Sequence, residues 1–119
     1  MSQPVILVVD DDPEVRPLAA AILEDAGFRV LEAGGGDQAF RLLDQHLEIA
    51  LIFTDIVMPG IDGFALADQA KLKRPDLKVL YTTGYVSMTP ETGISIHGTV
   101  LPKPYRPGQL EAWVRQALG

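Results

Sequence analysis

The chain contains no cysteine, and this absence removes several classes of site. Without thiols there is no disulfide framework, no thiolate metal site and no cysteine nucleophile. The only two histidines, His46 and His97, are far apart in the sequence and lack neighbouring ligand residues. We therefore expect both histidines to be surface or loop residues.

Basic charge and long apolar runs are also scarce. Lys and Arg total 10 against 16 Asp and Glu, which gives a formal net charge of −6 and argues against nucleic-acid binding. No stretch approaches the roughly 20 apolar residues of a membrane span. The apolar run after Met-Ser-Gln-Pro lacks a basic region before it and is too short for a signal peptide. We expect a cytoplasmic protein with no membrane partner.

The length and composition are those of one globular domain. The chain has 119 residues, of which 47% are hydrophobic and 22% are charged. This is enough for one core and too little for two. We expect a single domain over residues 1–119.

Strand-like apolar segments alternate with helix-like segments. Strands are predicted at residues 5–9, 28–33, 49–53, 79–82 and 100–101, and helices at 12–26, 37–46, 64–74 and from 107 onward. The first helix is expected to open with Asp12 as its N-cap and to place Leu18 on its inner face. This alternation predicts an α/β fold, a doubly wound parallel sheet with helices on both faces.

The segment from 86 to 99 fits the alternation poorly. A fourth helix is expected there, but Pro90, Gly93, Gly98 and many Ser, Thr and Ile residues are poor helix formers. We expect this helix to be short or irregular.

Acidic residues follow two of the predicted strands. One apolar run stops at Asp10, Asp11 and Asp12, and another stops at Asp55. If both strands belong to one parallel sheet, their carboxyl ends lie side by side, which is where such sheets bind ligands. Crowded carboxylates repel one another unless a cation neutralises them, and oxygen ligands suit Mg²⁺. The sequence therefore predicts a Mg²⁺ site for phosphate chemistry.

Taken together, the residues at the strand ends resemble those of a response-regulator receiver domain of two-component signalling. The motifs are Asp10 and Asp11, then Asp55 within Asp-Ile-Val-Met-Pro-Gly-Ile-Asp-Gly, then Thr83, then Lys103 followed by proline. The resemblance covers essentially the whole chain and is weakest from 86 to 99. It implies a flavodoxin-like (βα)5 fold with strand order 2-1-3-4-5. The Thr-Gly-Tyr run at 83–85 is similar to that of stand-alone or hybrid-kinase-associated receivers.

The resemblance also implies roles. Asp55 would accept a phosphoryl group from a phosphohistidine on a histidine kinase or a histidine phosphotransfer protein. Asp10, Asp11, Asp55 and the backbone carbonyl of Val57 would hold Mg²⁺, and Thr83 and Lys103 would contact the phosphoryl oxygens. The chain would be a switch for a downstream protein, a monomer or weak dimer, and not an enzyme beyond slow self-dephosphorylation. Val57 and Tyr85 lie two residues past Asp55 and Thr83, positions that influence loss of the phosphoryl group in this family. Neither is an obvious water-activating base, so we expect self-dephosphorylation to be slow.

Two departures from the receiver pattern concern the output side of the domain: the residue at position 100 and the poorly helical segment 86–99. Receivers often carry an aromatic residue three positions before the lysine, where this chain has Val100. We therefore hypothesise that the 86–99 segment orders on phosphorylation or on partner binding. The chain closes at Gly119 just after the last predicted helix, and its Met-Ser start favours a stand-alone protein over an excised domain.

Two other functions stay open. Asp10-x-Asp12, a threonine and a lysine are similar to a Mg²⁺-dependent phosphatase of the haloacid-dehalogenase superfamily, in which Asp10 would take the phosphate. That motif wants a threonine where this chain has Glu14. The third possibility is a degenerate receiver that acts only as a binding module.

Overall fold

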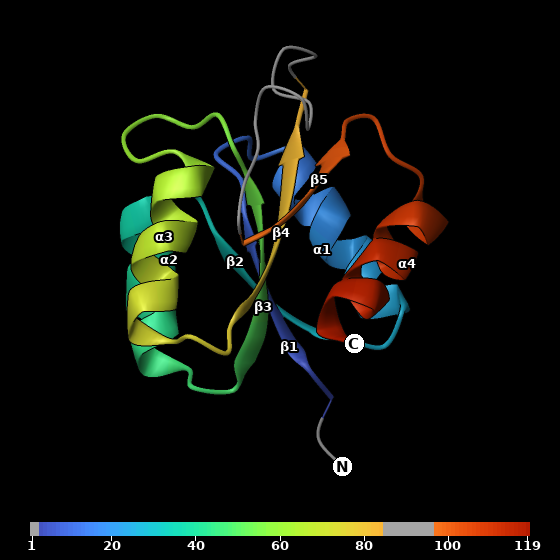
Figure 1. Ribbon diagram of the computed structural model, residues 1–119. Coiled ribbons are helices and arrows are strands. Elements are labelled where there is room, and N and C mark those ends of the chain that lie inside the picture. Colours follow the sequence, from blue (N-terminus) through green and yellow to red (C-terminus); the bar gives the residue numbers. More distant parts are fainter. Residues whose placement is uncertain (1–2, 85–96) are drawn as a thin grey trace.

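Five parallel strands and four helices make up the described part of the chain, residues 3–84 and 97–119 of the computed structural model (Figure 1). Their order is β1 (Val5–Val9), α1 (Val15–Asp25), β2 (Arg29–Ala33), α2 (Gly36–Gln45), β3 (Ile49–Asp55), α3 (Gly63–Lys73), β4 (Lys78–Thr83), β5 (Gly98–Pro102) and α4 (Pro107–Leu118). The strands form one sheet in the order β2-β1-β3-β4-β5, and every pairing is parallel. This confirms the predicted α/β class and strand order.

The expected fourth helix falls mainly on residues outside the described ranges. Of the 86–99 segment, the structure describes only 97–99, and β5 already begins at Gly98. Of the helices that are described, none has the length and hydropathy needed to cross a membrane.

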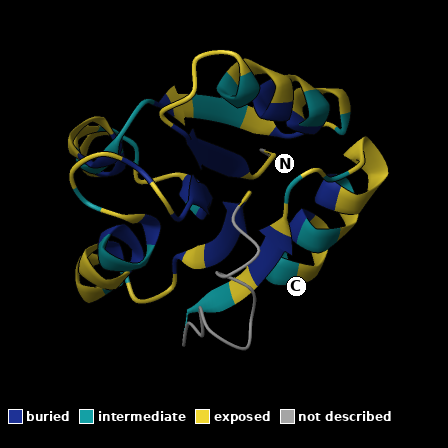
Figure 2. Cartoon of the chain, turned by 90° about the horizontal axis from the view of Figure 1, so that it is seen from above, coloured by how far each residue is buried: buried dark blue, intermediate teal, exposed yellow. Residues whose placement is uncertain are grey.

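The helices cover both faces of the sheet. In Figure 1, α2 and α3 lie on one side and α1 and α4 on the other. All five residues of β1, Val-Ile-Leu-Val-Val, are buried, because a strand covered on both faces needs apolar side chains in both directions. Leu7 belongs to the hydrophobic cluster on the α2–α3 side, and Ile6 and Val8 belong to the cluster on the α1–α4 side. Figure 2 shows the buried sheet at the centre and exposed residues along the outer sides of the helices.

The first helix begins later than predicted. The helix proper starts at Val15, but the Asp12 carboxylate already accepts hydrogen bonds from the N–H groups of Glu14 at 2.9 Å and Val15 at 3.4 Å. Asp12 therefore caps the turn that leads into α1. Leu18 was predicted on the inner face but is 65% exposed. Ala19, Ala20 and Leu23 fill the buried stripe of α1, and Leu18 falls beyond its edge.

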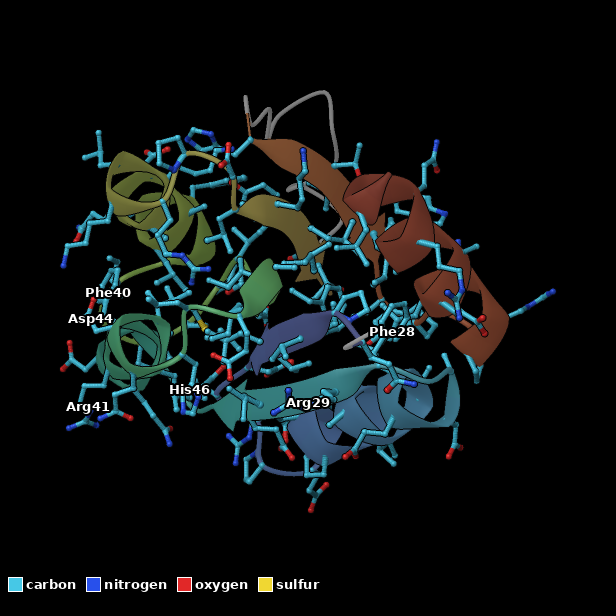
Figure 3. The ribbon with its side chains drawn as sticks, turned by 90° about the horizontal axis from the view of Figure 1, so that it is seen from below. Phe28, Arg29, Phe40, Arg41, Asp44 and His46 are labelled. Atoms are coloured by element: carbon cyan, nitrogen blue, oxygen red, sulfur yellow. The ribbon has the colours of Figure 1, made fainter. Side chains whose placement is uncertain are left out.

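The amino ends of the strands are closed by a contact between the end of α1 and α4. Phe28, just before β2, is seen from this side in Figure 3. The guanidinium carbon of Arg115 lies 4.8 Å from the centroid of the Phe28 ring. Arg115 Nη2 also donates a hydrogen bond to the carbonyl of Ala26 at 2.8 Å, so α4 is held to α1 at the end of the sheet away from the strand carboxyl ends.

Candidate functional site

The carboxyl ends of β1 and β3 bring three carboxylates to one point. Asp10 and Asp11 directly follow β1, and Asp55 is the last residue of the neighbouring β3. One oxygen from each of the three lies within 4.8 Å of the others. Asp10 and Asp55 are buried, and Asp11 is exposed. We refer to these three residues as the acidic cluster.

Lys103 joins two members of the acidic cluster. Its Nζ donates hydrogen bonds to Asp10 Oδ2 at 3.1 Å and to Asp55 Oδ2 at 3.2 Å. Lys103 directly follows β5, and its N–H donates to the carbonyl of Thr83 at 2.8 Å. The hydrogen-bonded ladder between β4 and β5 therefore continues one residue past β5 and fixes the starting point of the lysine side chain.

Burial and neighbouring charges shift the pKa values of Asp55, Lys103 and Tyr105. Burial raises the pKa of Asp55, against the opposing effect of the Lys103 ammonium. Burial by itself lowers the pKa of Lys103, but the hydrogen bond to Asp10 and the charge of Asp55 outweigh it, so the net pKa is raised. Burial also raises the pKa of the nearby Tyr105 phenol. At neutral pH, Lys103 is therefore an ammonium and Tyr105 a neutral phenol.

The donor set fits Mg²⁺. The acidic cluster presents three carboxylates and is contacted by one ammonium, so negative charge is in excess. Hard divalent ions take oxygen ligands of this kind, and no sulfur or imidazole lies in the cluster. Val57, named as a carbonyl ligand, lies in the loop after β3, where its N–H donates to Asp55 Oδ1 at 3.3 Å. The role of its carbonyl stays a prediction.

The loop between β3 and α3 is held close to the strand ends. The N–H of Ile56 donates to the carbonyl of Thr82 at 2.9 Å, and the N–H of Gly63 donates to the carbonyl of Ile56 at 2.8 Å. Gly60 has a φ of +78°, which a side chain would strain. Asp62 is the N-cap of α3, because its Oδ1 accepts from the N–H of Ala65 at 2.8 Å.

The two threonines at the end of β4 have different surroundings. Thr82 Oγ1 donates to the carbonyl of Leu101 at 2.7 Å, so Thr82 is a strand residue as expected. Thr83 is the last residue of β4 and is buried next to the start of Lys103. Both histidines lie outside the cluster: His46 Nδ1 is 3.7 Å from Glu48, and His97 Nε2 is 2.6 Å from Asp68.

Sequence reasoning missed a hollow that opens beside Lys103. It has a volume of about 550 Å³ and lies between Val15 and Leu18 of α1 on one side and Gly84, Lys103 and Tyr105 on the other. A side-chain carbon at Gly84 would meet nothing within 4 Å. Since Lys103 lines the hollow and contacts Asp10 and Asp55, the hollow lies beside the acidic cluster. The exposed Leu18 gives it an apolar rim.

Sequence reasoning also missed Arg16. Its Nη1 donates to the main-chain carbonyl of Asp10 at 3.0 Å, and its Nε donates to Glu32 at 3.3 Å. A basic residue one turn after an acidic run is a weak sequence signal, because nothing in that spacing shows that the side chain turns back to the main chain.

Comparison with known proteins agrees with this arrangement. The sequence model of the response regulator receiver domain matches residues 6–115. The chain is 36% identical over 102 residues to the response regulator receiver protein CpdR of Brucella abortus, with 84% of each protein covered. It is also 36% identical to the response regulator Rre1 of Synechocystis, of which it spans 53%.

Solved structures agree as well. The receiver domain of the hybrid histidine kinase CckA is 34% identical, with a TM-score of 0.81 and coverage of 97% of this chain and 99% of that one. A receiver domain protein from Methanospirillum hungatei has a TM-score of 0.87 at 27% identity, with 98% and 94% covered.

Proposed function

Because the chain belongs to the response regulator receiver domain family, we propose that it accepts a phosphoryl group on Asp55 and thereby switches its contacts with other proteins. The observation that supports this best is the bridge from Lys103 Nζ to both Asp10 and Asp55 within the acidic cluster. A carboxylate held by an ammonium among further carboxylates is suited to receiving a phosphate rather than to binding a neutral ligand.

The chemistry would be a direct displacement at phosphorus. A carboxylate oxygen of Asp55 attacks a phosphohistidine, a P–O bond forms, the P–N bond breaks, and the electron pair returns to the imidazole nitrogen. Phosphoryl transfer needs position and charge neutralisation more than covalent assistance. Lys103 moves from pairing with the carboxylate to pairing with a phosphoryl oxygen, and the Thr83 hydroxyl donates to another. Mg²⁺ held by Asp10, Asp11, Asp55 and the Val57 carbonyl would supply further positive charge for the transferred group.

The partners in this proposal are proteins. The phosphodonor is a histidine kinase or a histidine phosphotransfer protein, and the hollow gives such a donor an apolar surface beside Lys103, which contacts Asp55. The receiver of the hybrid kinase CckA is a relative of this chain. A downstream protein would read the phosphorylated state of a monomer or weak dimer in the cytoplasm.

We expect no turnover by this domain beyond slow self-dephosphorylation. Val57, next to Asp55 in the loop, carries no group that activates water. Residues 1–119 act as one receiver domain in this scheme. Since the chain spans about half of Rre1, no activity of that longer protein is carried over.

The test is intact-mass detection of phosphorylation by phosphoramidate with Mg²⁺. Wild type is expected to gain one phosphoryl group, and Asp55→Asn and samples with EDTA are expected to gain none. Asp68→Asn, an exposed carboxylate on α3, is the matched control and should behave like wild type.

Other results would point to the other functions. Incorporation that survives Asp55→Asn but is lost in Asp10→Asn would favour the phosphatase-like use of Asp10. No incorporation from phosphoramidate or from any histidine kinase would leave a binding module only.

A further inference from the structure

Arg16 connects three elements at the edge of the acidic cluster. It lies in the first turn of α1, bonds the carbonyl of Asp10 just beyond β1 at 3.0 Å, and pairs with Glu32 of β2 at 3.3 Å. Its side chain is only 24% exposed, so the guanidinium is packed rather than free in solvent.

The carbonyl that Arg16 holds belongs to the peptide unit between Asp10 and Asp11. A peptide unit is planar, so fixing its carbonyl also fixes the N–H and the position of the next Cα. The N–H of Asp10 is already bonded to the carbonyl of Ala33 at 3.1 Å. Both main-chain groups of Asp10 are therefore held, and Arg16 holds the one from which Asp11 starts.

Asp11 depends on this support more than its neighbours do. The side chain of Asp10 accepts from Lys103 and from the N–H of Asp12, and the side chain of Asp55 accepts from Lys103 and from Val57. Among residues 3–84 and 97–119, none donates a hydrogen bond to the Asp11 carboxylate. The hydrogen bonds of the backbone therefore determine where this side chain starts, and no side-chain hydrogen bond from the described residues adds to them.

The loop after β2 also lies close to the guanidinium. A side-chain carbon built at Gly34 would lie 3.2 Å from Arg16 Nη1, so glycine leaves only the space that the guanidinium needs. The N–H of Gly34 is itself bonded to Gln38 Oε1 at 2.8 Å, which fixes that stretch of loop to α2.

We propose that Arg16 is a positioning residue for the cation site: through the Asp10–Asp11 peptide unit it orients the Asp11 carboxylate and so strengthens the binding of a divalent ion. This rests on the proposed function, which includes the ion. The charge of Arg16 would act in the opposite direction, because a cation near the cluster repels another cation. The two effects therefore predict opposite changes in Mg²⁺ affinity when Arg16 is replaced by a neutral residue. Loss of positioning weakens binding, and loss of the positive charge strengthens it.

The experiment titrates MgCl₂ into the ¹⁵N-labelled protein and follows backbone amide shifts by NMR. Arg16→Met is expected to weaken Mg²⁺ binding about tenfold, the lower range for loss of an outer-shell partner of a metal ligand. Arg16→Lys should fall between, because a single ammonium cannot reproduce both contacts of the guanidinium. Arg115→Met is the matched control, since Arg115 also bonds a carbonyl and a glutamate, but at the opposite end of the sheet.

The rate of phosphorylation by phosphoramidate supplies a second measurement. At saturating Mg²⁺, the rate of Arg16→Met should recover most of its wild-type value, while the Mg²⁺ concentration for half-maximal rate rises about tenfold. A variant that was only less stable would not combine a near-normal rate at saturating Mg²⁺ with a raised Mg²⁺ requirement.

Equal or tighter Mg²⁺ binding by Arg16→Met, or an equal loss in Arg115→Met, would overturn the positioning role while leaving the proposed function intact. If wild type shows no saturable shifts with Mg²⁺, both the inference and the cation part of the proposed function fail. If Arg16→Met does not fold, Arg16→Lys and Gly34→Ala are read in its place, and unchanged affinity in both counts against the proposal.

Discussion

Replacing Gly63 by alanine should destabilise the protein, because the first residue of α3 packs directly on the end of β3. A side-chain carbon at Gly63 would lie 2.3 Å from the Asp55 carbonyl oxygen and 2.9 Å from the Ile56 Cα. The closer distance is about 1 Å short of van der Waals contact. Both neighbours are backbone atoms that cannot rotate away, so α3 or the strand end has to move.

The expected cost follows from the kind of clash. Inserting a methyl group into a tightly packed position typically costs about 1–3 kcal/mol. We expect a loss of about 2 kcal/mol in the free energy of unfolding, or a Tm lower by about 8 °C for a domain of this size. Urea unfolding followed by far-UV circular dichroism measures this, and the slope m should stay unchanged.

Gly108 provides the control. It also lies in the first turn of a helix, α4, but a side-chain carbon there meets nothing within 4 Å. Gly108→Ala should raise the free energy of unfolding by about 0.5 kcal/mol, since alanine restricts the unfolded chain and favours the helix. If Gly63→Ala proved as stable as Gly108→Ala, the packing argument for the loop beneath Asp55 would be refuted.

Three further predictions concern the acidic cluster. Lys103→Met, which removes the bridge to Asp10 and Asp55, should slow phosphorylation by phosphoramidate about 100-fold in an intact-mass time course, and a rate within twofold of wild type would contradict its role. Val57→Asn places a polar group at a 42% exposed position in the loop after Asp55 and should speed loss of the phosphoryl group about tenfold. The loss is measured after the phosphodonor is removed, and an unchanged rate would count against the slow self-dephosphorylation that we expect. Mg²⁺ at ten times its dissociation constant should add about 1.4 kcal/mol to the free energy of unfolding of wild type, and EDTA should abolish this gain. An equal gain in Asp55→Asn would argue against a ligand role for Asp55.

The central strands were predictable from the sequence because strands that are buried on both faces consist almost entirely of apolar residues. The all-apolar Val5–Val9 and the run that ends at Asp55 need cover on both faces, and this alone indicates central strands with carboxylates at their ends. The strand order was not derivable in this way, since alternation does not say which strands are neighbours. It came from the resemblance to receiver domains.

The features that could not be predicted from the sequence depend on the direction in which a side chain points rather than on the residue type. Leu18 and Ala19 are both apolar and adjacent, but only Ala19 faces the sheet, because the buried stripe of α1 is narrow. Arg16 bonds a main-chain carbonyl, and a carbonyl is present at every position, so no sequence pattern marks it as a partner. The start of α1 was placed too early because Asp12 caps a turn ahead of the helix.

Over the residues that the structure describes, 3–84 and 97–119, the sheet divides the buried hydrophobic side chains into two clusters that share no residue. Side chains on opposite faces do not touch, so volume lost on one face is not repaired by rearrangement on the other. Substitutions in one cluster are therefore tolerated or rejected nearly independently of substitutions in the other. Repacking around Leu110 and Val114 is therefore expected to alter α1 and the hollow beside Lys103 while leaving the α2–α3 side undisturbed. The surface that we propose for the phosphodonor would then change without a change to the other half of the interior.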